Sequence, residues 1–202
     1  MVQKSSNKPR GRPRSYDPGE ALAQVMQTFW QKGYAGTSVD DLCAATGLNK
    51  PSLYSGLGDK QQLYRQALQA YVQQVGAGMA HVLGDASLSL REALDTLMRQ
   101  AVALYQDGRG CFLVSTTPAV AWDDQVVREM VAQALRTQDD ALAARFKLAQ
   151  QQGQISKQAN PDTLGALTAA LLHSLSLRAR AGCEREALLA WAEQGVQGLL
   201  AR

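Results

Sequence analysis

The chain has 202 residues, of which 46% are hydrophobic and only 6% aromatic, with three cysteines and a formal net charge of +3. This length fits one or two small domains with a real core, and the abundance of Ala, Leu and Gln favours helices over strands. No stretch approaches the roughly 20 apolar residues of a membrane span, and no apolar segment follows the basic start as in a secretory signal. An odd number of widely spaced cysteines argues against a disulfide framework, so we expect a cytoplasmic protein.

The positive charge is concentrated in the first third of the chain. Residues 1–66 contain nine Lys and Arg residues against five Asp and Glu, a net charge of +4, whereas the remainder has a net charge of −1. Residues 1–15 have no acid and no apolar periodicity, which predicts a basic, flexible arm. A basic segment joined to a nearly neutral body indicates a polyanionic partner for that segment.

An amphipathic helix is the first element predicted after the arm. Asp17 can cap it, Pro18 suits its first position, and Gly33 is the residue expected at its end. Its apolar residues recur at helical spacing, which indicates one buried face. These residues are Leu22, Val25, Met26, Phe29 and Trp30.

Two short helices joined by a glycine-containing turn are predicted next. Thr37 and Ser38 can cap the first, and the Thr-Gly-Leu turn at 46–48 ends it after about two turns. Asn49 can cap the second helix, in which Leu53 is the inward-facing residue. This arrangement is typical of a helix-turn-helix.

The rest of the chain is predicted to be helical. No alternating strand pattern flanked by turn signals occurs, so the expected fold class is all-α. Pro118 is expected to interrupt the apolar stretch 111–121. Helices are predicted to begin at capping boxes at 59–62 and 89–92, to run over 123–152, to begin at Asn160-Pro161, and to run over 184–200.

A helix-turn-helix places its second helix in the major groove, where the N-terminal residues of that helix reach base edges. Taken alone, Lys50 and Lys60 would be interpreted as solvated lysines and Tyr54 as a packing residue, but the motif favours DNA contact. The arm can follow the phosphate backbone or enter an adjacent minor groove. The predicted DNA-binding residues are Arg12, Arg14, Thr37, Ser38, Lys50, Pro51, Ser52, Tyr54 and Lys60.

The segments 37–42, 46–54 and 58–60, preceded by Gly-Arg-Pro-Arg-Ser-Tyr-Asp at 11–17, resemble the signature of the tetracycline-repressor (TetR) family of bacterial transcriptional regulators. The resemblance implies three N-terminal helices for DNA binding and about six more for ligand binding and dimerisation. It also implies that the last two helices pair with those of a second copy. The expected organisation is a flexible arm at 1–15, a helix-turn-helix domain at 16–58, and a ligand-sensing and dimerisation domain at 59–202.

Cys111 is a candidate oxidant-sensing thiol. It follows a glycine at the expected start of a helix, beside Arg109, and both a helix N-terminus and a neighbouring cation lower the pKa of a thiol. The segment 110–116 also resembles one in a subset of the same family, some of whose members sense electrophiles or oxidants through cysteine. The alternative is that Cys111 is a small buried hydrophobic residue.

A reversible ligand pocket is the other possible sensor. Such a pocket is mostly apolar with few polar groups, and its expected residues serve equally well as ordinary core. No spacing of His and Cys matches a metal site, so neither a metal nor a cofactor is expected. The candidate lining residues are Met98, Val102, Tyr105, Phe112, Trp122, Met130 and His173.

These observations together predict a sequence-specific, dimeric transcriptional repressor. A small apolar or electrophilic inducer, or cysteine oxidation, would release it from a near-palindromic operator. In the alternative interpretation, the larger domain only dimerises and senses no ligand. A helical enzyme is the competing class, but no nucleophile motif, phosphate loop or catalytic pair of carboxylates is present, so we expect no enzyme activity.

Overall fold

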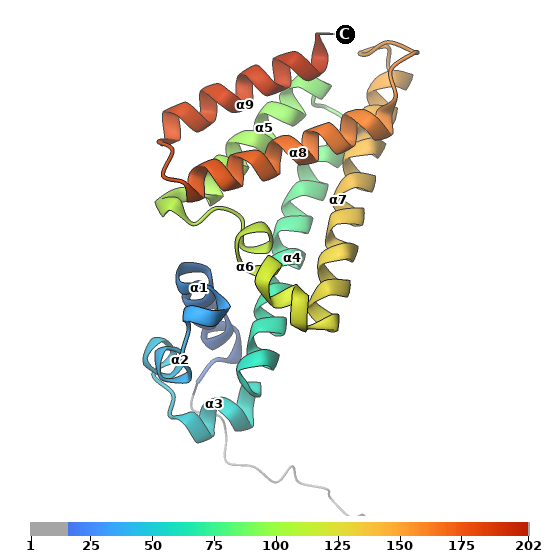
Figure 1. The fold of residues 1–202 in the computed structure, drawn as a ribbon. Coiled ribbons are helices and arrows are strands. Elements are labelled where there is room, and N and C mark those ends of the chain that lie inside the picture. Colours follow the sequence, from blue (N-terminus) through green and yellow to red (C-terminus); the bar gives the residue numbers. More distant parts are fainter. Residues whose placement is uncertain (1–15, 202) are drawn as a thin grey trace, which may run out of the picture.

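The computed structural model describes residues 16–201, and every regular element in that range is a helix (Figure 1). The predicted all-α fold is confirmed, with nine α-helices among these residues. The predicted arm, with Arg12 and Arg14, lies outside the described residues. The helices are α1 (Pro18–Gly36), α2 (Val39–Thr46), α3 (Lys50–Leu57), α4 (Lys60–Gly84), α5 (Leu90–Leu104), α6 (Phe112–Asp123), α7 (Gln125–Gln151), α8 (Pro161–Arg180) and α9 (Arg185–Leu200), with a 3-10 turn at Gln106–Gly108.

Most of the helix starts predicted from the sequence are confirmed by their capping hydrogen bonds. The carboxylate of Asp17 accepts from two backbone N–H groups in the first turn of α1. Ser38, Asp59 and Ser89 each open a helix with a reciprocal capping box. Asn160 caps α8, which has proline at its first position. These bonds satisfy backbone N–H groups that have no partner inside a helix.

Gly33 was expected to end a helix and Pro118 to interrupt one, but only Gly33 breaks its helix. Gly33 has a φ of 71° and breaks α1 before one further turn, as the sequence predicted. Pro118, by contrast, does not interrupt α6, so that prediction is wrong. Pro118 is exposed, so its ring and its missing N–H are accommodated on the solvent side of a continuous helix.

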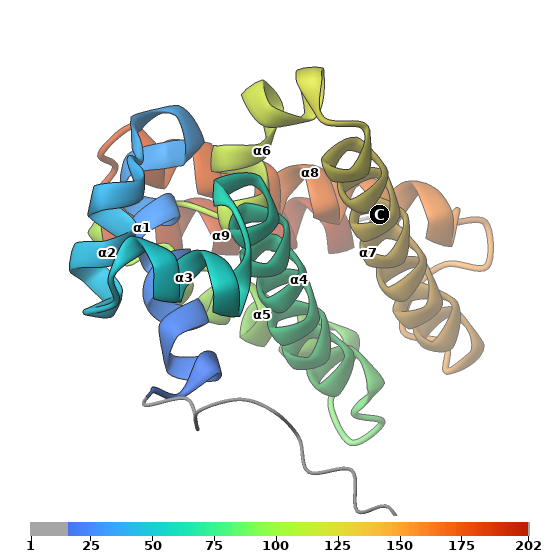
Figure 2. The same ribbon diagram turned by 90° about the horizontal axis from the view of Figure 1, so that it is seen from below.

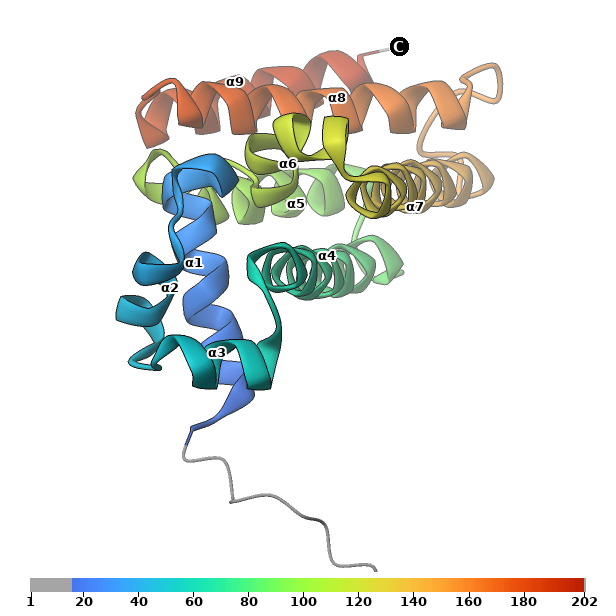
Figure 3. The ribbon, with the colours of Figure 1, turned by 60° about the horizontal axis from the view of Figure 1, so that its bottom comes forward.

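The helices are arranged in layers beneath an outer pair. Figure 3 shows α8 and α9 side by side as this outer pair, with α5 packed beneath them. The long helix α7 packs along α8, and α4 packs against α1 and α7. Figure 1 shows α1, α2 and α3 grouped at the opposite end from α9. None of the helices in the described residues is long and apolar enough to span a membrane.

The buried apolar residues form two clusters. The N-terminal core contains residues of α1, α2, α3 and α4, of α6, and of the start of α7. The C-terminal core contains residues of the end of α4 and of α5, α7, α8 and α9. Buried members of the N-terminal core include Val25, Phe29, Trp30, Leu42, Leu53, Tyr64, Leu68, Phe112 and Val127. Those of the C-terminal core include Leu94, Met98, Val102, Leu142, Phe146, Leu172, Leu175 and Val196.

Candidate DNA-binding surface and thiol site

The helix α3 is held to the molecule by one face and exposes the other. Leu53 and Leu57 are buried and belong to the N-terminal core. The Asn49 side chain accepts a hydrogen bond from the Ser52 backbone N–H at 2.9 Å, which caps the start of the helix. The preceding turn contains Gly47 with a φ of 65°, a left-handed conformation that favours glycine. The local sequence and two apolar anchors therefore determine the direction of α3.

The outward face of α3 carries side chains that the sequence predicted to contact DNA. Lys50, Pro51 and Tyr54 are exposed, while Ser52 is half-buried. The Lys50 ammonium lies 5.7 Å from the centre of the Tyr54 ring, so a positive charge and an aromatic surface form one patch. Figure 2 shows α2 and α3 side by side next to α1. This face offers the charge and hydrogen-bond donors that phosphates and base edges require.

Thr37 and Ser38, both predicted to contact DNA, lie in different environments. The Thr37 side chain is 1% exposed, and its hydroxyl donates to the Gly33 carbonyl oxygen at 2.7 Å. The prediction is therefore wrong for the Thr37 side chain, because its hydroxyl closes the end of α1 instead of facing solvent. Ser38 is exposed, and its hydroxyl donates to the Asp41 carboxylate at 2.7 Å.

Lys60, the last of the predicted DNA-binding residues, begins α4 shortly after α3 ends. Its ammonium lies 4.5 Å from the centre of the Tyr34 ring of α1. Burial, followed by the carboxylates of Asp124 and Asp59, raises the pKa of Tyr34, so this ring is neutral at pH 7. The neutral ring holds the Lys60 cation where α1 meets α4.

Two buried side chains join the first helices to α6. The Trp30 indole N–H donates to the Gly110 carbonyl oxygen at 3.0 Å, and the Tyr64 hydroxyl lies 2.8 Å from the Thr116 hydroxyl. The rings of Trp30 and Tyr64 both pack on Phe112, with centroid separations of 5.9 and 5.8 Å. The packing of the helix-turn-helix therefore continues across the predicted domain boundary into α6.

Cys111 lies at the N-terminal end of α6, between the two cores. Its thiol accepts a hydrogen bond from the Tyr71 hydroxyl at 3.1 Å, and its backbone N–H donates to the Ser176 hydroxyl at 2.7 Å. It packs against both the N-terminal core and the C-terminal core. Any atom added to the sulfur would therefore crowd residues of both clusters.

The electrostatics of this thiol differ from the sequence-based expectation. The Arg109 guanidinium, expected to lower the pKa of Cys111, lies 4.8 Å from the centre of the Trp30 ring, turned toward α1. Burial raises the pKa of Cys111, and the opposing hydrogen bonds from Tyr71 and from the first turn of α6 do not cancel it. The predicted low pKa is therefore wrong, because desolvation outweighs the helix terminus.

Five of the residues predicted to line a ligand pocket are divided between the two cores. Met98, Val102 and Tyr105 belong to the C-terminal core, whereas Phe112 and Met130 pack in or against the N-terminal core. Their apolar spacing along the chain reflects burial in two separate cores. As a set, they do not surround one site.

Trp122 and His173 complete the predicted pocket set and lie apart. Trp122 is 82% exposed at the end of α6, so its assignment as a pocket residue is wrong. His173 is half-buried on α8, where its Nε2 lies 3.1 Å from the Gln138 side-chain oxygen on α7. Burial lowers the pKa of His173, so the ring is neutral at pH 7.

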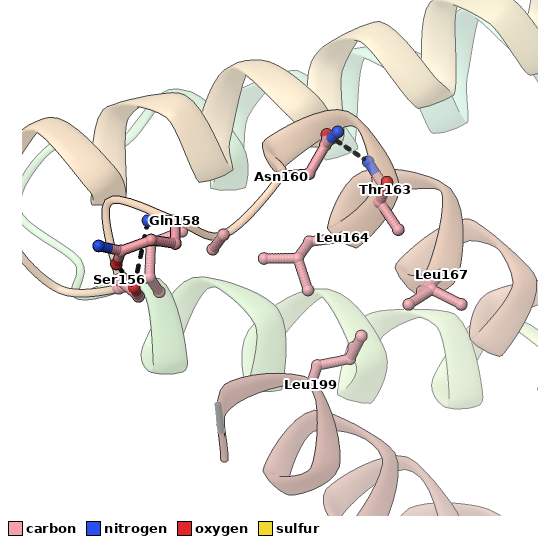
Figure 4. Close-up of a pocket in the computed structure, with 9 residues that line it drawn as sticks. Ser156, Gln158, Asn160, Thr163, Leu164, Leu167 and Leu199 are labelled. Carbon is pink, nitrogen blue, oxygen red and sulfur yellow. Dashed lines mark hydrogen bonds between the residues drawn. The ribbon is translucent and has the colours of Figure 1, made fainter.

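Two adjoining cavities of about 360 Å³ each lie beside α8 and α9. Figure 4 shows the first, which is open to solvent on one side and is bordered by the α7–α8 connection and by side chains of α8 and α9. None of the seven predicted pocket residues lines either cavity. The first is lined by Ile155, Ser156, Gln158, Ala159, Asn160, Thr163, Leu164, Leu167 and Leu199, and the second by Leu164, Leu167, Leu171, Gly195, Gly198 and Leu199.

Several side chains that organise these sites were missed by the sequence analysis. Tyr71 and Ser176 contact Cys111 from α4 and α8, and no sequence signal links residues so far apart in the chain. Asp124 is the N-cap of α7, although the sequence analysis placed it inside the helix predicted over 123–152. Its ion pair with Arg65 could not be read from spacing. Among residues 16–201, no cluster of His, Cys, Asp and Glu is arranged to hold a metal ion.

Two family models match separate segments of the chain. Residues 22–67 match the family described as "Bacterial regulatory proteins, tetR family". Residues 90–194, more than half of the chain, match "Tetracyclin repressor-like, C-terminal domain". Families of this description consist of DNA-binding regulators and not of enzymes.

Individual relatives cover between two thirds and nine tenths of the chain. The HTH-type transcriptional repressor ComR of Escherichia coli (strain K12) is 27% identical over 185 residues, which are 90% of this chain and 88% of ComR. The repressor BdcR of the same organism is 29% identical over 133 residues, covering 66% of this chain and 67% of BdcR.

Comparison with a solved structure also indicates the TetR family. The TetR-family regulator CifR, as a cysteine mutant in complex with 26-bp operator DNA, is 30% identical and has a TM-score of 0.81, covering 93% of this chain and 98% of that chain. The fold, the helix-turn-helix and both halves of the sequence agree with one assignment. The chain belongs to the TetR family of transcriptional regulators.

Proposed function

We propose that this protein is a homodimeric repressor that binds a near-palindromic operator through α3. The observation that carries the proposal is the exposed face of α3, where Lys50, Pro51 and Tyr54 project from a helix anchored by Leu53. ComR and BdcR are named repressors, and CifR is bound to operator DNA, which supports the same role here. We infer that residues 16–58 bind DNA and that the remainder senses an effector and dimerises.

The second copy is proposed to pack on an exposed apolar surface, the α8–α9 face. On α8 this face comprises Leu167, Ala170, Ser174 and Leu177 at the i, i+3, i+7, i+10 spacing of a helix–helix seam. Leu167 and Leu177 are 45% and 58% exposed. On α9 it comprises Trp191 and Gly198, which are exposed, whereas Gly195 is half-buried where α9 packs on Leu171 of α8. Exposed apolar side chains at this spacing favour burial against an identical pair of helices.

Dimerisation through this face gives the DNA contacts their expected geometry. A two-fold axis would place two copies of α3 in successive major grooves, roughly 34–36 Å apart. The operator should then be near-palindromic, because each copy contacts the same half-site sequence.

Lys50→Ala tests the assignment of α3. We expect about tenfold weaker operator binding and a salt dependence whose logarithmic slope is smaller by about 1 per protomer, because one cation per half-site is lost. The measurement is a gel shift on DNA upstream of the gene, repeated at three salt concentrations.

Lys157→Ala is the matched control, because Lys157 is an exposed cation in the α7–α8 connection, away from α3. It should leave both the affinity and the salt slope unchanged. Equal losses in the two variants would show that only the overall charge matters and would contradict the assignment of α3.

We further propose that modification of the Cys111 thiol releases the operator. The thiol lies where both cores pack, and the Tyr71 hydroxyl hydrogen bond stabilises the thiolate as it forms. With a peroxide, the thiolate sulfur attacks one oxygen, the O–O bond breaks, and sulfenic acid and hydroxide are the products. The added atoms would disrupt the junction of α6 with α1 and α4, and hence the presentation of α3.

The sensing proposal is tested in a protein that keeps Cys111 but carries Cys43→Ser and Cys183→Ser. Peroxide or a quinone should weaken operator binding at least about tenfold, and a thiol reductant should reverse the peroxide effect. Adding Cys111→Ser should abolish both responses. Release that persists in the Cys111→Ser protein would sink the thiol mechanism and favour a reversible ligand, whereas no release in either protein would favour a domain that only dimerises.

The raised pKa of Cys111 gives a pH signature. Because only the thiolate reacts, the alkylation rate at Cys111 should rise about tenfold per pH unit and show no plateau below about pH 9. Tyr71→Phe removes a hydrogen bond that lowers this pKa, so it should slow alkylation further at pH 8. A plateau near neutral pH in the parent protein would contradict this account of the thiol.

A further inference from the structure

A single carboxylate joins the start of α4 to the corner between α6 and α7. The Asp124 side chain is 3% exposed, and its two oxygens accept from the Arg65 guanidinium at 2.8 and 3.0 Å. The Gln61 amide also donates to Asp124, at 3.0 Å. The same carboxylate caps α7 through the backbone N–H groups of Val126 and Val127. All four donors are held by helices, so the position of Asp124 is tightly defined.

The partners of Asp124 lie directly after the recognition helix. α3 ends at Leu57, and α4 begins at Lys60, so Gln61 and Arg65 occupy its first two turns. A shift of this end of α4 relative to the α6–α7 corner would therefore move α3 with it. On the other side, α6 extends about 18 Å from Cys111 to the corner.

We propose that the Asp124–Arg65 ion pair is a positioning contact that sets the angle at which each protomer presents α3 to DNA. In a dimer, this angle determines which separation of operator half-sites is accepted. The proposal rests on the proposed function, since it concerns operator recognition. Asp124 and Arg65 act through α4 and need not touch DNA themselves.

The ion pair would act by preorganising α3 in the orientation that fits the operator. A bidentate arginine–carboxylate pair allows little rotation between the elements it joins, unlike a single hydrogen bond. Without the pair, α3 samples more orientations, and only a fraction of the protein is ready to fit a two-site operator. The apparent affinity falls in proportion to that fraction, while the loss of affinity caused by altered half-site spacing becomes smaller.

Asp124→Asn is the decisive variant. Asparagine is as good an N-cap as aspartate, so the start of α7 is retained while the charge on Arg65 loses its partner. Removing a negative charge should by itself strengthen binding to DNA. Loss of positioning acts in the opposite direction, and we expect about tenfold weaker binding to an operator selected with the parent protein.

The second readout is half-site spacing. The parent protein should discriminate strongly against the selected operator with one central base pair added, and Asp124→Asn should reduce that discrimination by about tenfold. Arg65→Lys keeps the charge but not the bidentate geometry, so it should fall between the parent and Arg65→Gln. Circular dichroism melting of each variant checks that it is folded.

Asp95→Asn is the charge-matched control, since Asp95 forms an exposed ion pair with Arg91 on α5. It should leave the spacing preference unchanged. If Asp124→Asn binds as tightly as Asp95→Asn and keeps the parent's spacing preference, the positioning role is wrong while the proposed function stands. A parent protein that selects no operator at all would overturn both.

Discussion

Trp30→Ala is expected to lower the free energy of unfolding by about 4 kcal/mol, the largest stability loss predicted for this chain. The indole is 3% exposed and packs edge-on against Tyr71 and Phe112, with centroid separations of 5.1 and 5.9 Å. Its removal leaves a cavity in the N-terminal core and deprives the Gly110 carbonyl oxygen of its donor. Urea denaturation followed by circular dichroism measures the loss.

Trp30→Phe separates packing from hydrogen bonding. Phenylalanine keeps an aromatic ring but cannot donate to Gly110, so we expect a loss of about 1–2 kcal/mol. The slope of the free energy against urea concentration should be the same in all three proteins, which makes the comparison valid. A loss below about 1 kcal/mol for Trp30→Ala would mean that the N-terminal core collapses around the vacancy.

Leu167→Arg is expected to convert the proposed dimer to monomers and to weaken operator binding at least about a hundredfold. Leu167 is 45% exposed in one protomer, so arginine costs little in the monomer. In the proposed dimer, two charges would be buried near the symmetry axis without partners. A monomer contacts one half-site and loses the effective concentration that links two sites. Sedimentation analysis gives the oligomeric state and a gel shift the affinity.

Ala144→Arg provides the control for this substitution, because Ala144 is exposed on α7 and lies outside the α8–α9 face. It should leave the dimer and its affinity intact. A Leu167→Arg protein that still sediments as a dimer would show that self-association uses another surface, and the α8–α9 face would then have to be abandoned as the interface.

The elements of the helix-turn-helix could be predicted from short-range patterns. Ser38 caps α2 through a residue three positions away, and Asn49 caps α3 in the same manner. Gly47 supplies the left-handed turn between them. Leu53 was assigned as the anchor from its place in the motif, and it is fully buried. Such features depend on a few neighbouring residues, so they can be read directly from their order.

The environment of each candidate side chain could not be predicted in the same way. Apolar spacing did not distinguish Trp122, which faces solvent, from Phe112, which is fully buried on the same helix. The position of Arg109 beside Cys111 in the chain suggested a lowered thiol pKa, yet the guanidinium turns toward Trp30. Proximity in the chain does not specify direction, because neighbouring side chains leave the backbone at different angles.

The sequence by itself therefore determined the fold class, most of the helix starts and the anchored, exposed helix α3. Only the tertiary structure decided which distant residues meet: the Trp30 indole donates to the Gly110 carbonyl oxygen, 80 positions away, and the Arg65 guanidinium donates to Asp124, 59 positions away. Helix caps and turns depend on the hydrogen bonds and backbone angles of a few neighbouring residues. Contacts between helices, and the burial that raises the pKa of Cys111, depend on how all the helices pack together, which no short segment specifies.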